Sequence, residues 1–144
     1  DSDHPQVAAL ATSLVAGVDE LRSQAVALYM HVRDAYRYDP YHIDLTVAGM
    51  RASSVLAQGR GWCIPKAALL AALCRSVGIP ARLATGFVPG TRDPLTGRFV
   101  VRERDAHAWA EVWFPGIGWQ GFDPTASVPL AGLALFHVAT RCCP

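Results

Sequence analysis

The pattern of the chain changes at Gly78-Ile79-Pro80, and this change limits the folds open to it. Before it, apolar residues recur at helical spacing, as they do from Leu21 to Ala35. After it, short segments rich in β-forming residues are separated by Pro, Gly and Asp clusters, which predicts strands over residues 81–88, 98–103, 107–114 and 118–122. Helices first and strands second, joined by short turns, indicate an α+β fold with a mainly antiparallel sheet.

The first half of the chain contains the predicted helices. Residues 7–15 form one, and a second runs from Leu21 to near Tyr38, where Pro40 disfavours helical backbone in the residue before it. Residues 41–54 show no clean period and are predicted to be irregular. A further helix has Pro65 in its first turn and ends near Val77, before glycine and proline. This helix places Cys63 at or just before its N-terminus.

Length and composition exclude several classes of protein. With 144 residues, 51% apolar and 17% charged, the chain fits one folded domain, which we assign to residues 1–132, with 133–144 as a tail of unknown role. The formal net charge of +1 and the lack of a basic run give no case for nucleic-acid binding. The longest apolar run, residues 67–73, is far shorter than the roughly 20 residues of a membrane-spanning helix, so we expect no membrane contact from this segment itself.

Cys63 is the candidate nucleophile. Thiols attack as thiolates, which the unpaired N–H groups and the positive dipole end of a helix N-terminus stabilise. The same N–H groups can bind the oxyanion of a tetrahedral intermediate. The alternative is a buried cysteine that acts only as a small apolar residue. The glycine and the aromatic residue that precede Cys63 at a helix start favour the nucleophile.

His107 and Asp123 are predicted to meet across a hairpin. The turn around Gly116 joins the strands 107–114 and 118–122, and the partner of residue 107 then falls near residue 125. An aspartate there can accept a hydrogen bond from the imidazole and fix its tautomer. Taken singly, His107 could also be an ordinary strand-end histidine, and Asp123 could simply belong to a turn. Their order and spacing after Cys63 favour a Cys-His-Asp catalytic triad.

The stretch from residue 61 to residue 125 resembles the core of the transglutaminase-like superfamily. The matching motifs stand at residues 61–63, 66–67, 78–82, 85–87, 105–112, 118–119 and 123–125. The resemblance implies a papain-like fold with a catalytic helix packed on the sheet. It also implies Cys63 as nucleophile, His107 as base and then acid, Asp123 as orienting residue, and a thioester intermediate.

The part from residue 98 to residue 130 is most similar to bacterial members in which this domain belongs to a larger membrane-anchored protein, exposed outside the cytoplasm. The residues after the cysteine, Ile64-Pro65-Lys66, are closer to other bacterial branches. The resemblance to the membrane-anchored members implies a bacterial, extracytoplasmic domain. It also implies that the substrate is a protein or peptide.

Three functions remain open from the sequence. Cys63 can transfer an acyl group from a glutamine or peptide carbonyl to an amine, as a transglutaminase does. It can transfer the same group to water, as a cysteine peptidase or amidase does. The third alternative is a catalytically silent binding module that keeps the fold. The triad is common to the first two, because they differ only in how well the acceptor site excludes water.

Other residues receive smaller roles. Trp62 and Trp109 are candidates to flank a substrate channel, and Tyr38 or Trp62 is a candidate second oxyanion donor. We expect Arg82 to be structural and Glu111 to be an ordinary polar strand position.

Cys74 is expected to be packed in the core, and Cys142 and Cys143 receive no role. No Cys-x-x-Cys or close histidine pair suggests a metal, and no motif suggests a cofactor.

Overall fold

The computed structural model describes residues 1–125 of the chain, so the end of the predicted domain and the tail with Cys142 and Cys143 lie outside the described residues. The helices are α1 (Pro5–Val15), α2 (Leu21–Ala35), α3 (Ala52–Gln58) and α4 (Cys63–Ser76), with a short 3₁₀ helix, η1, at Glu103–Asp105. The strands are β1 (Arg37–Tyr38), β2 (Arg60–Gly61), β3 (Ala81–Phe87), β4 (Thr91–Arg92), β5 (Phe99–Val100), β6 (Ala106–Phe114) and β7 (Gly118–Phe122).

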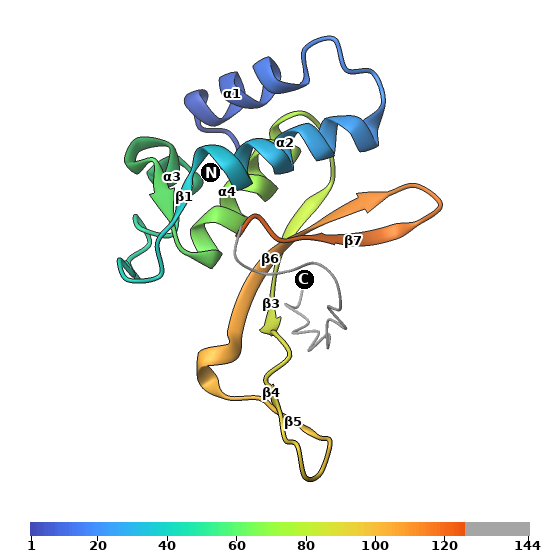
Figure 1. Ribbon diagram of the computed structural model, residues 1–144. Coiled ribbons are helices and arrows are strands. Elements are labelled where there is room, and N and C mark those ends of the chain that lie inside the picture. The colour runs from blue at the N-terminus through green and yellow to red at the C-terminus, as the bar shows by residue number, and fades with distance from the viewer. Residues whose placement is uncertain (126–144) are drawn as a thin grey trace, which may run out of the picture.

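Helices and sheet form separate parts of the fold. The strands β3, β6 and β7 make a three-stranded antiparallel sheet in the order β3-β6-β7. The helices gather together on one part of this sheet, while β3 and β6 continue away from them (Figure 1). This is the predicted α+β arrangement, and the helix expected to follow Cys63 is α4.

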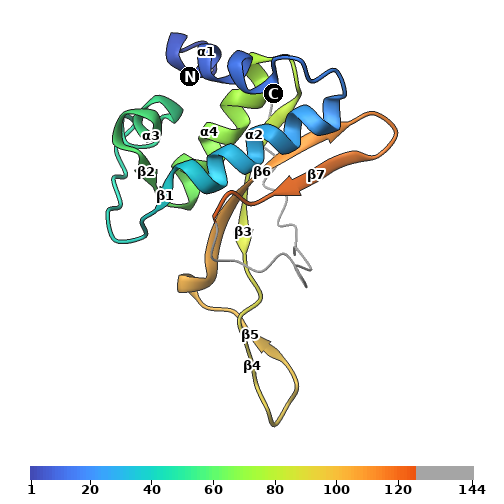
Figure 2. The ribbon, with the colours of Figure 1, turned by 45° about the horizontal axis from the view of Figure 1, so that its top comes forward.

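Helix α4 is the centre of the molecule. It contacts α1, α2, α3, β2, β3 and β6, and Figure 2 shows it enclosed among these elements. Half of its residues are alanine or leucine and its polar residues do not gather on one side, so it has no polar face to turn toward solvent. Leu69, Leu70 and Leu73 are all fully buried in the core. The helix ends at Ser76, and Gly78, two residues later, turns the chain away with a φ of 80° that suits glycine.

Strand β6 packs against this core with one face. Ala110, Val112 and Phe114 belong to the same buried cluster as the leucines of α4. The other face carries Glu111, which the sequence predicted to be an ordinary polar position. That prediction is wrong, because Glu111 is buried and Arg82, its direct partner on β3, forms an ion pair with it at 2.7 Å. The guanidinium of Arg82 also lies 4.2 Å from the ring centroid of Trp119. Both contacts join strands of the sheet, in keeping with the structural role expected of Arg82.

Two local predictions need correction. Residues 98–103 were predicted to be one strand, but only Phe99–Val100 pairs, with β4, and the chain then turns into η1. The carboxylate of Asp105 accepts a hydrogen bond from the backbone N–H of Arg102, which favours this turn over an extended strand. Residues 41–54 were predicted to be irregular, but α3 begins at Ala52.

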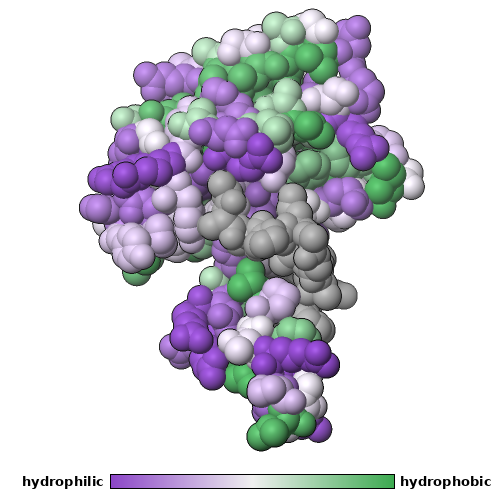
Figure 3. Space-filling view, in the orientation of Figure 1, coloured by the Kyte–Doolittle hydropathy of each residue, from purple (hydrophilic) through white to green (hydrophobic). Residues whose placement is uncertain are grey.

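The β4–β5 hairpin stands apart from the rest of the structure. It projects from the ends of β3 and β6, away from the helices (Figure 1). Its surface mixes hydrophilic and hydrophobic residues (Figure 3), and Leu95 and Phe99 are 94% and 57% exposed. At its base, Phe87 pairs with Ala106, and Val88 donates a backbone hydrogen bond to Asp105.

None of the helices within residues 1–125 combines the length and the apolar character that crossing a bilayer requires.

The central position of α4 predicts a large difference between two leucine substitutions. Leu70→Ala leaves a cavity in the core and should lower the free energy of unfolding by about 2–5 kcal/mol. Leu83→Ala, on a residue that is 42% exposed, should cost less than about 1 kcal/mol. Urea denaturation of the two variants measures the difference, and equal costs would show that α4 is not the packing centre.

Candidate active site

A cavity of about 380 Å³ opens between the start of α4 and the adjoining parts of β3 and β6. Trp62, Cys63 and Ile64 line it from the helix side. Residues 85–87 of β3 and residues 106–107 of β6 line it from the sheet side. The predicted nucleophile and the predicted base therefore line the same cavity.

Cys63 is the first residue of α4 and its side chain is mostly buried, with 8% of the residue exposed. Trp62, the N-cap residue, supplies no side-chain hydrogen bond to the helix, and Pro65 has no N–H group. The first turn closes with a bond from Lys66 N–H to the carbonyl of Trp62 at 3.2 Å. Within the described part of the chain, the backbone N–H groups of Cys63 and Ile64 donate no hydrogen bond, so they remain available at the helix start.

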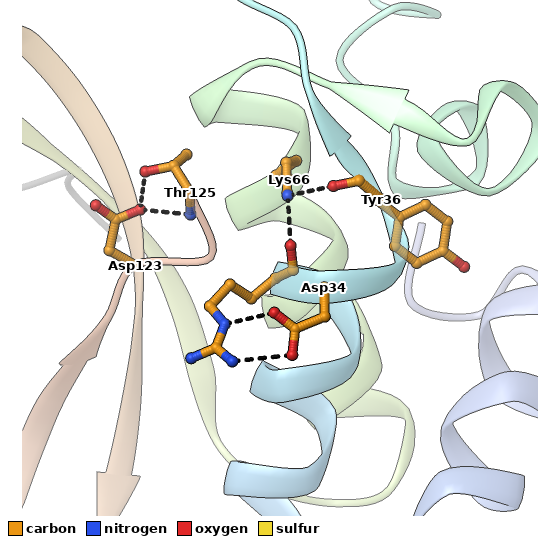
Figure 4. A network of polar contacts seen from close by, with 6 residues as sticks. Asp34, Tyr36, Lys66, Asp123 and Thr125 are labelled. Carbon is orange, nitrogen blue, oxygen red and sulfur yellow. Dashed lines mark hydrogen bonds and ion pairs between the residues drawn. The ribbon is translucent and has the colours of Figure 1, made fainter. Parts of the chain in front are cut away.

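His107, Asp123 and Thr125 form a hydrogen-bonded chain beside Cys63. Nε2 of His107 lies 2.7 Å from Oδ2 of Asp123. The other oxygen of Asp123 accepts from the hydroxyl of Thr125 at 2.6 Å and from its backbone N–H at 2.9 Å, as Figure 4 shows. Asp123 and Thr125 are only 6% and 2% exposed. These bonds fix the carboxylate in one orientation, with one oxygen left to the imidazole.

The pairing of β6 with β7 explains why these residues meet. Phe114 is opposite Gly118 and Ala110 is opposite Phe122. Continuing this register places Thr125 opposite His107, the position expected from the turn around Gly116. Asp123 then lies close enough to His107 for a direct hydrogen bond.

The pair is held in its charged form. Burial on its own would lower the pKa of His107, but the interactions with Asp123 and Cys63 outweigh it and raise the pKa to about 9. Burial would raise the pKa of Asp123, but the bonds from His107 and Thr125 outweigh it and lower that pKa. A protonated imidazole beside an ionised carboxylate follows at neutral pH.

Lys66 is fully buried one helical turn after Cys63. Its ammonium donates to the carbonyls of Tyr36 at 2.5 Å and Arg33 at 3.3 Å, at the C-terminal end of α2 (Figure 4). Burial lowers its pKa to about 8, although the negative charges of Asp123 and Asp34 act in the opposite direction. Lys66 therefore ties the end of α2 to the start of α4.

The remaining predicted residues fall in different places. Trp62 lines the cavity, whereas Trp109 is 3% exposed and is not among the described residues that line it. Cys74 is fully buried, and burial raises the pKa of its thiol to about 12, as suits a core residue. Residues 1–125 hold no cluster of three potential metal ligands.

Thr125 and Lys66 are residues to which the sequence assigned no individual role. The positions of these two residues in the sequence could have indicated their roles. A threonine two residues after an aspartate can bond back to its carboxylate. A lysine in the first turn of an apolar helix has no solvent-facing side and needs buried acceptors.

Comparison with known proteins identifies the family. The family model of the transglutaminase-like superfamily matches residues 8–124, and the chain belongs to that superfamily. A protein-glutamine gamma-glutamyltransferase of Pseudomonas aeruginosa is 35% identical over 117 residues, which cover 76% of this chain and 18% of that protein. The uncharacterized protein ML0607 of Mycobacterium leprae is 34% identical over 111 residues, or 77% of this chain and 37% of its own.

Solved structures share the fold. The periplasmic domain of TgpA from Pseudomonas aeruginosa superposes with a TM-score of 0.71 at 29% identity, covering 83% of this chain and 42% of that one. A Cytophaga hutchinsonii protein, provisionally assigned as a cysteine protease, gives a TM-score of 0.69 at 27% identity, covering 90% of this chain and 39% of that one. The fold is thus the α+β papain-like fold of transglutaminase-like proteins. The chain spans less than half the length of each of these relatives.

The His107–Asp123 bond predicts an unusual titration. Because folding raises the pKa of His107 from its ordinary 6.5 to about 9, the stability that this group contributes is fully present below pH 6.5 and is lost as the pH rises through about 9. Asp123→Asn removes the carboxylate charge and should lower the pKa of His107 by about 1–3 pH units. NMR titration of the imidazole measures this, with Asp34→Asn, at an exposed position of α2, as the control that leaves the pKa of His107 unchanged.

Thr125 predicts a second, separable effect. Thr125→Val keeps the side-chain shape but removes the hydroxyl bond to Asp123, and should lower the free energy of unfolding by about 1.5–3 kcal/mol. Thr125→Ser retains the hydroxyl and should recover most of this loss. Thermal and urea unfolding compare the two variants, and equal stability of the valine and wild-type proteins would contradict a role for the hydroxyl.

Proposed function

We propose that this domain transfers acyl groups from amide bonds, with Cys63, His107 and Asp123 as its catalytic residues. The observation that carries the proposal is the buried bond of 2.7 Å between His107 and Asp123, beside a cysteine that starts a helix. A thiol, a base and a residue that orients the base are the three parts that nucleophilic acyl transfer needs. Family membership supports acyl transfer or cysteine-protease chemistry in general.

In the proposed reaction, the sulfur of Cys63 attacks the carbonyl carbon of a carboxamide or peptide. Asp123 occupies Nε2 of His107, so Nδ1 is the nitrogen that exchanges protons with the reacting groups. The imidazolium gives its proton to the departing nitrogen, which leaves as ammonia or an amine, and a thioester remains on Cys63. An amine or a water then gives a proton back to His107 and releases the acyl group.

The relatives favour a protein substrate. The Pseudomonas aeruginosa relative is named a protein-glutamine gamma-glutamyltransferase, which supports glutamine carboxamides as donors and amines as acceptors. Hydrolysis by the same residues is the second candidate, supported by the Cytophaga hutchinsonii neighbour. Trp62, which lines the cavity beside Cys63, is a proposed contact for either substrate, and Trp109 is proposed only as a support behind the site.

The similarity to the periplasmic domain of TgpA also bears on the cellular location of this domain. Because TgpA places its matching domain in the periplasm, we propose that this chain is an extracytoplasmic part of a longer bacterial protein. A membrane anchor, if present, would lie in that longer protein.

The test uses two cysteine variants and three readouts. Wild-type protein is incubated with casein and a fluorescent primary amine, and ammonia release, peptide release and amine incorporation are measured. Cys63→Ala should lower whichever of these the wild type shows by at least about 10³-fold, because it removes the nucleophile. Cys74→Ala, which alters a buried core cysteine, should keep the activity per folded molecule.

The outcomes separate the candidate functions. Ammonia release with amine incorporation identifies a transglutaminase. Ammonia or peptide release without incorporation identifies a hydrolase. Neither product, together with iodoacetamide labelling of Cys63 that is unaffected by His107→Ala, would reject catalysis in favour of the binding module.

A further inference from the structure

The segment between β3 and β6 begins and ends at the rim of the cavity. We call this segment, residues 88–105 with the β4–β5 hairpin and η1, the arm. Phe87 and Ala106, the paired residues on either side of the arm, both line the cavity. Phe87 is nevertheless 39% exposed, so it lies at the cavity mouth. A polypeptide that leaves the cavity past Phe87 therefore meets the arm, which projects from this point (Figure 1).

The arm carries the excess positive charge of the chain. The sequence has 13 basic and 12 acidic residues, and the arm holds four of the former and three of the latter, so the remaining charges are equal in number. All four basic residues are exposed arginines, and none forms an ion pair within residues 1–125; they are Arg92, Arg98, Arg102 and Arg104. The arm thus presents cations that lack a partner in the described part of the chain.

Two of the three acidic residues of the arm are used by its own backbone. The carboxylate of Asp93 accepts hydrogen bonds from the N–H groups of Leu95 and Thr96, at 2.8 and 3.3 Å. The carboxylate of Asp105 accepts from the N–H of Arg102 at 2.7 Å. These bonds hold the two carboxylates in the turns, so they do not pair with the arginine side chains beside them.

Two of the arginines share one face of the hairpin. Strand β5 places Val100 opposite Thr91 of β4. Arg98 and Arg102 lie two residues before and two residues after Val100, and alternate residues of an extended chain point to the same face. Arg102 keeps an extended backbone, with φ of −121° and ψ of 166°. At a rise of about 3.3 Å per residue, the two arginines are about 13 Å apart along the chain.

Apolar side chains are exposed on the same arm. They are Leu95, Phe99, Val100 and Val101, and Figure 3 shows hydrophobic and hydrophilic residues side by side on the projecting part of the molecule. Arginine and aromatic residues are enriched at protein–protein contacts, whereas lysine is depleted, and the arm contains no lysine. The arm therefore fits a polypeptide that carries both carboxylates and apolar side chains.

We propose that the arm binds the protein substrate beyond the residue that reacts, and that Arg98 and Arg102 select substrates with an acidic stretch in that place. This inference rests on the proposed function and adds the class of substrate to it. In an extended substrate, carboxylates four residues apart match the spacing of the two arginines. Thr91, at the start of the hairpin, is four residues from Phe87, so the acidic stretch begins about four residues from the reactive glutamine.

A surface of anionic lipids offers the same negative charge, but it does not account for the attachment of the arm at the cavity rim. A substrate does, because its reactive residue lies in the cavity while its flanking residues pass Phe87.

The test exchanges charges between the arm and the substrate. Arg98→Glu/Arg102→Glu reverses two charges of the arm. Arg22→Glu/Arg51→Glu, at two exposed positions that do not line the cavity, makes the same change in net charge and is the matched control. Three peptides carry one glutamine and differ only at the fourth and eighth residues on either side of it, which are glutamate, serine or lysine. Ammonia release in the presence of a primary amine gives kcat and KM for each peptide.

Wild type should prefer the glutamate peptide to the serine peptide by about 3–10-fold in kcat/KM, since exposed ion pairs contribute little each. The difference should lie in KM, because the contact is the same in the ground state and the transition state. It should shrink when the ionic strength is raised to about 1 M. Arg98→Glu/Arg102→Glu should prefer the lysine peptide instead, whereas the control variant should keep the wild-type order.

The outcomes separate this inference from the proposed function. Turnover of all three peptides by wild type with equal kcat/KM would overturn the inference alone. No ammonia from any peptide or from casein would reject the proposed function, and the inference with it. A uniform loss on all three peptides in the arm variant, without a change of order, would assign the two arginines a structural role. Binding to phosphatidylglycerol vesicles that the arm variant loses, with an unaltered peptide preference, would assign the arm to a membrane surface instead.

Discussion

The packing of α4 against β6 is the constraint on which the rest of the structure depends. Leu69, Leu70 and Leu73 of the helix share one buried cluster with Ala110 and Val112 of the strand. The alanines of this cluster, Ala71 and Ala72 on the helix and Ala110 on the strand, let helix and sheet approach closely, and a tightly packed contact resists sliding. The cysteine is the first residue of that helix and the histidine is the second residue of that strand, so the distance between them is set by the core. Loops, which deform more easily, contribute little to this geometry.

The buried charged groups around the site are matched with partners, which is a condition for burying them. Asp123 divides its oxygens between His107 and Thr125, and Lys66 satisfies two carbonyls at the end of a helix. The bonds of Lys66 also join two elements that are far apart in sequence, α2 and α4. The polar contacts therefore stabilise the same arrangement that the apolar core selects.

Much of this could be read from the sequence, for identifiable reasons. The helix from Cys63, the α+β order and the hairpin register depend on local patterns, namely alanine-rich helix formers and a turn around Gly116. The pairing of Glu111 with Arg82 was missed because it depends on the register between β3 and β6, which are separated by a long connection. Helix α3 is only seven residues long, too short to show a period, and the brief β5 strand is limited by the turn that Asp105 caps. The parallel pairing of β1 with β2 was equally hidden, because two residues leave no recognisable pattern in either strand.

The β4–β5 hairpin leaves the sheet at Phe87 and returns at Ala106, and these two residues are paired neighbours on the rim of the cavity. The two ends of the segment between them, residues 88–105, are thus held side by side by the pairing of β3 with β6. Residues can be added, removed or exchanged in this segment without moving the ends of β3 and β6. The length and sequence of this segment can therefore vary in evolution, or be changed by design, while the residues that line the cavity keep their places.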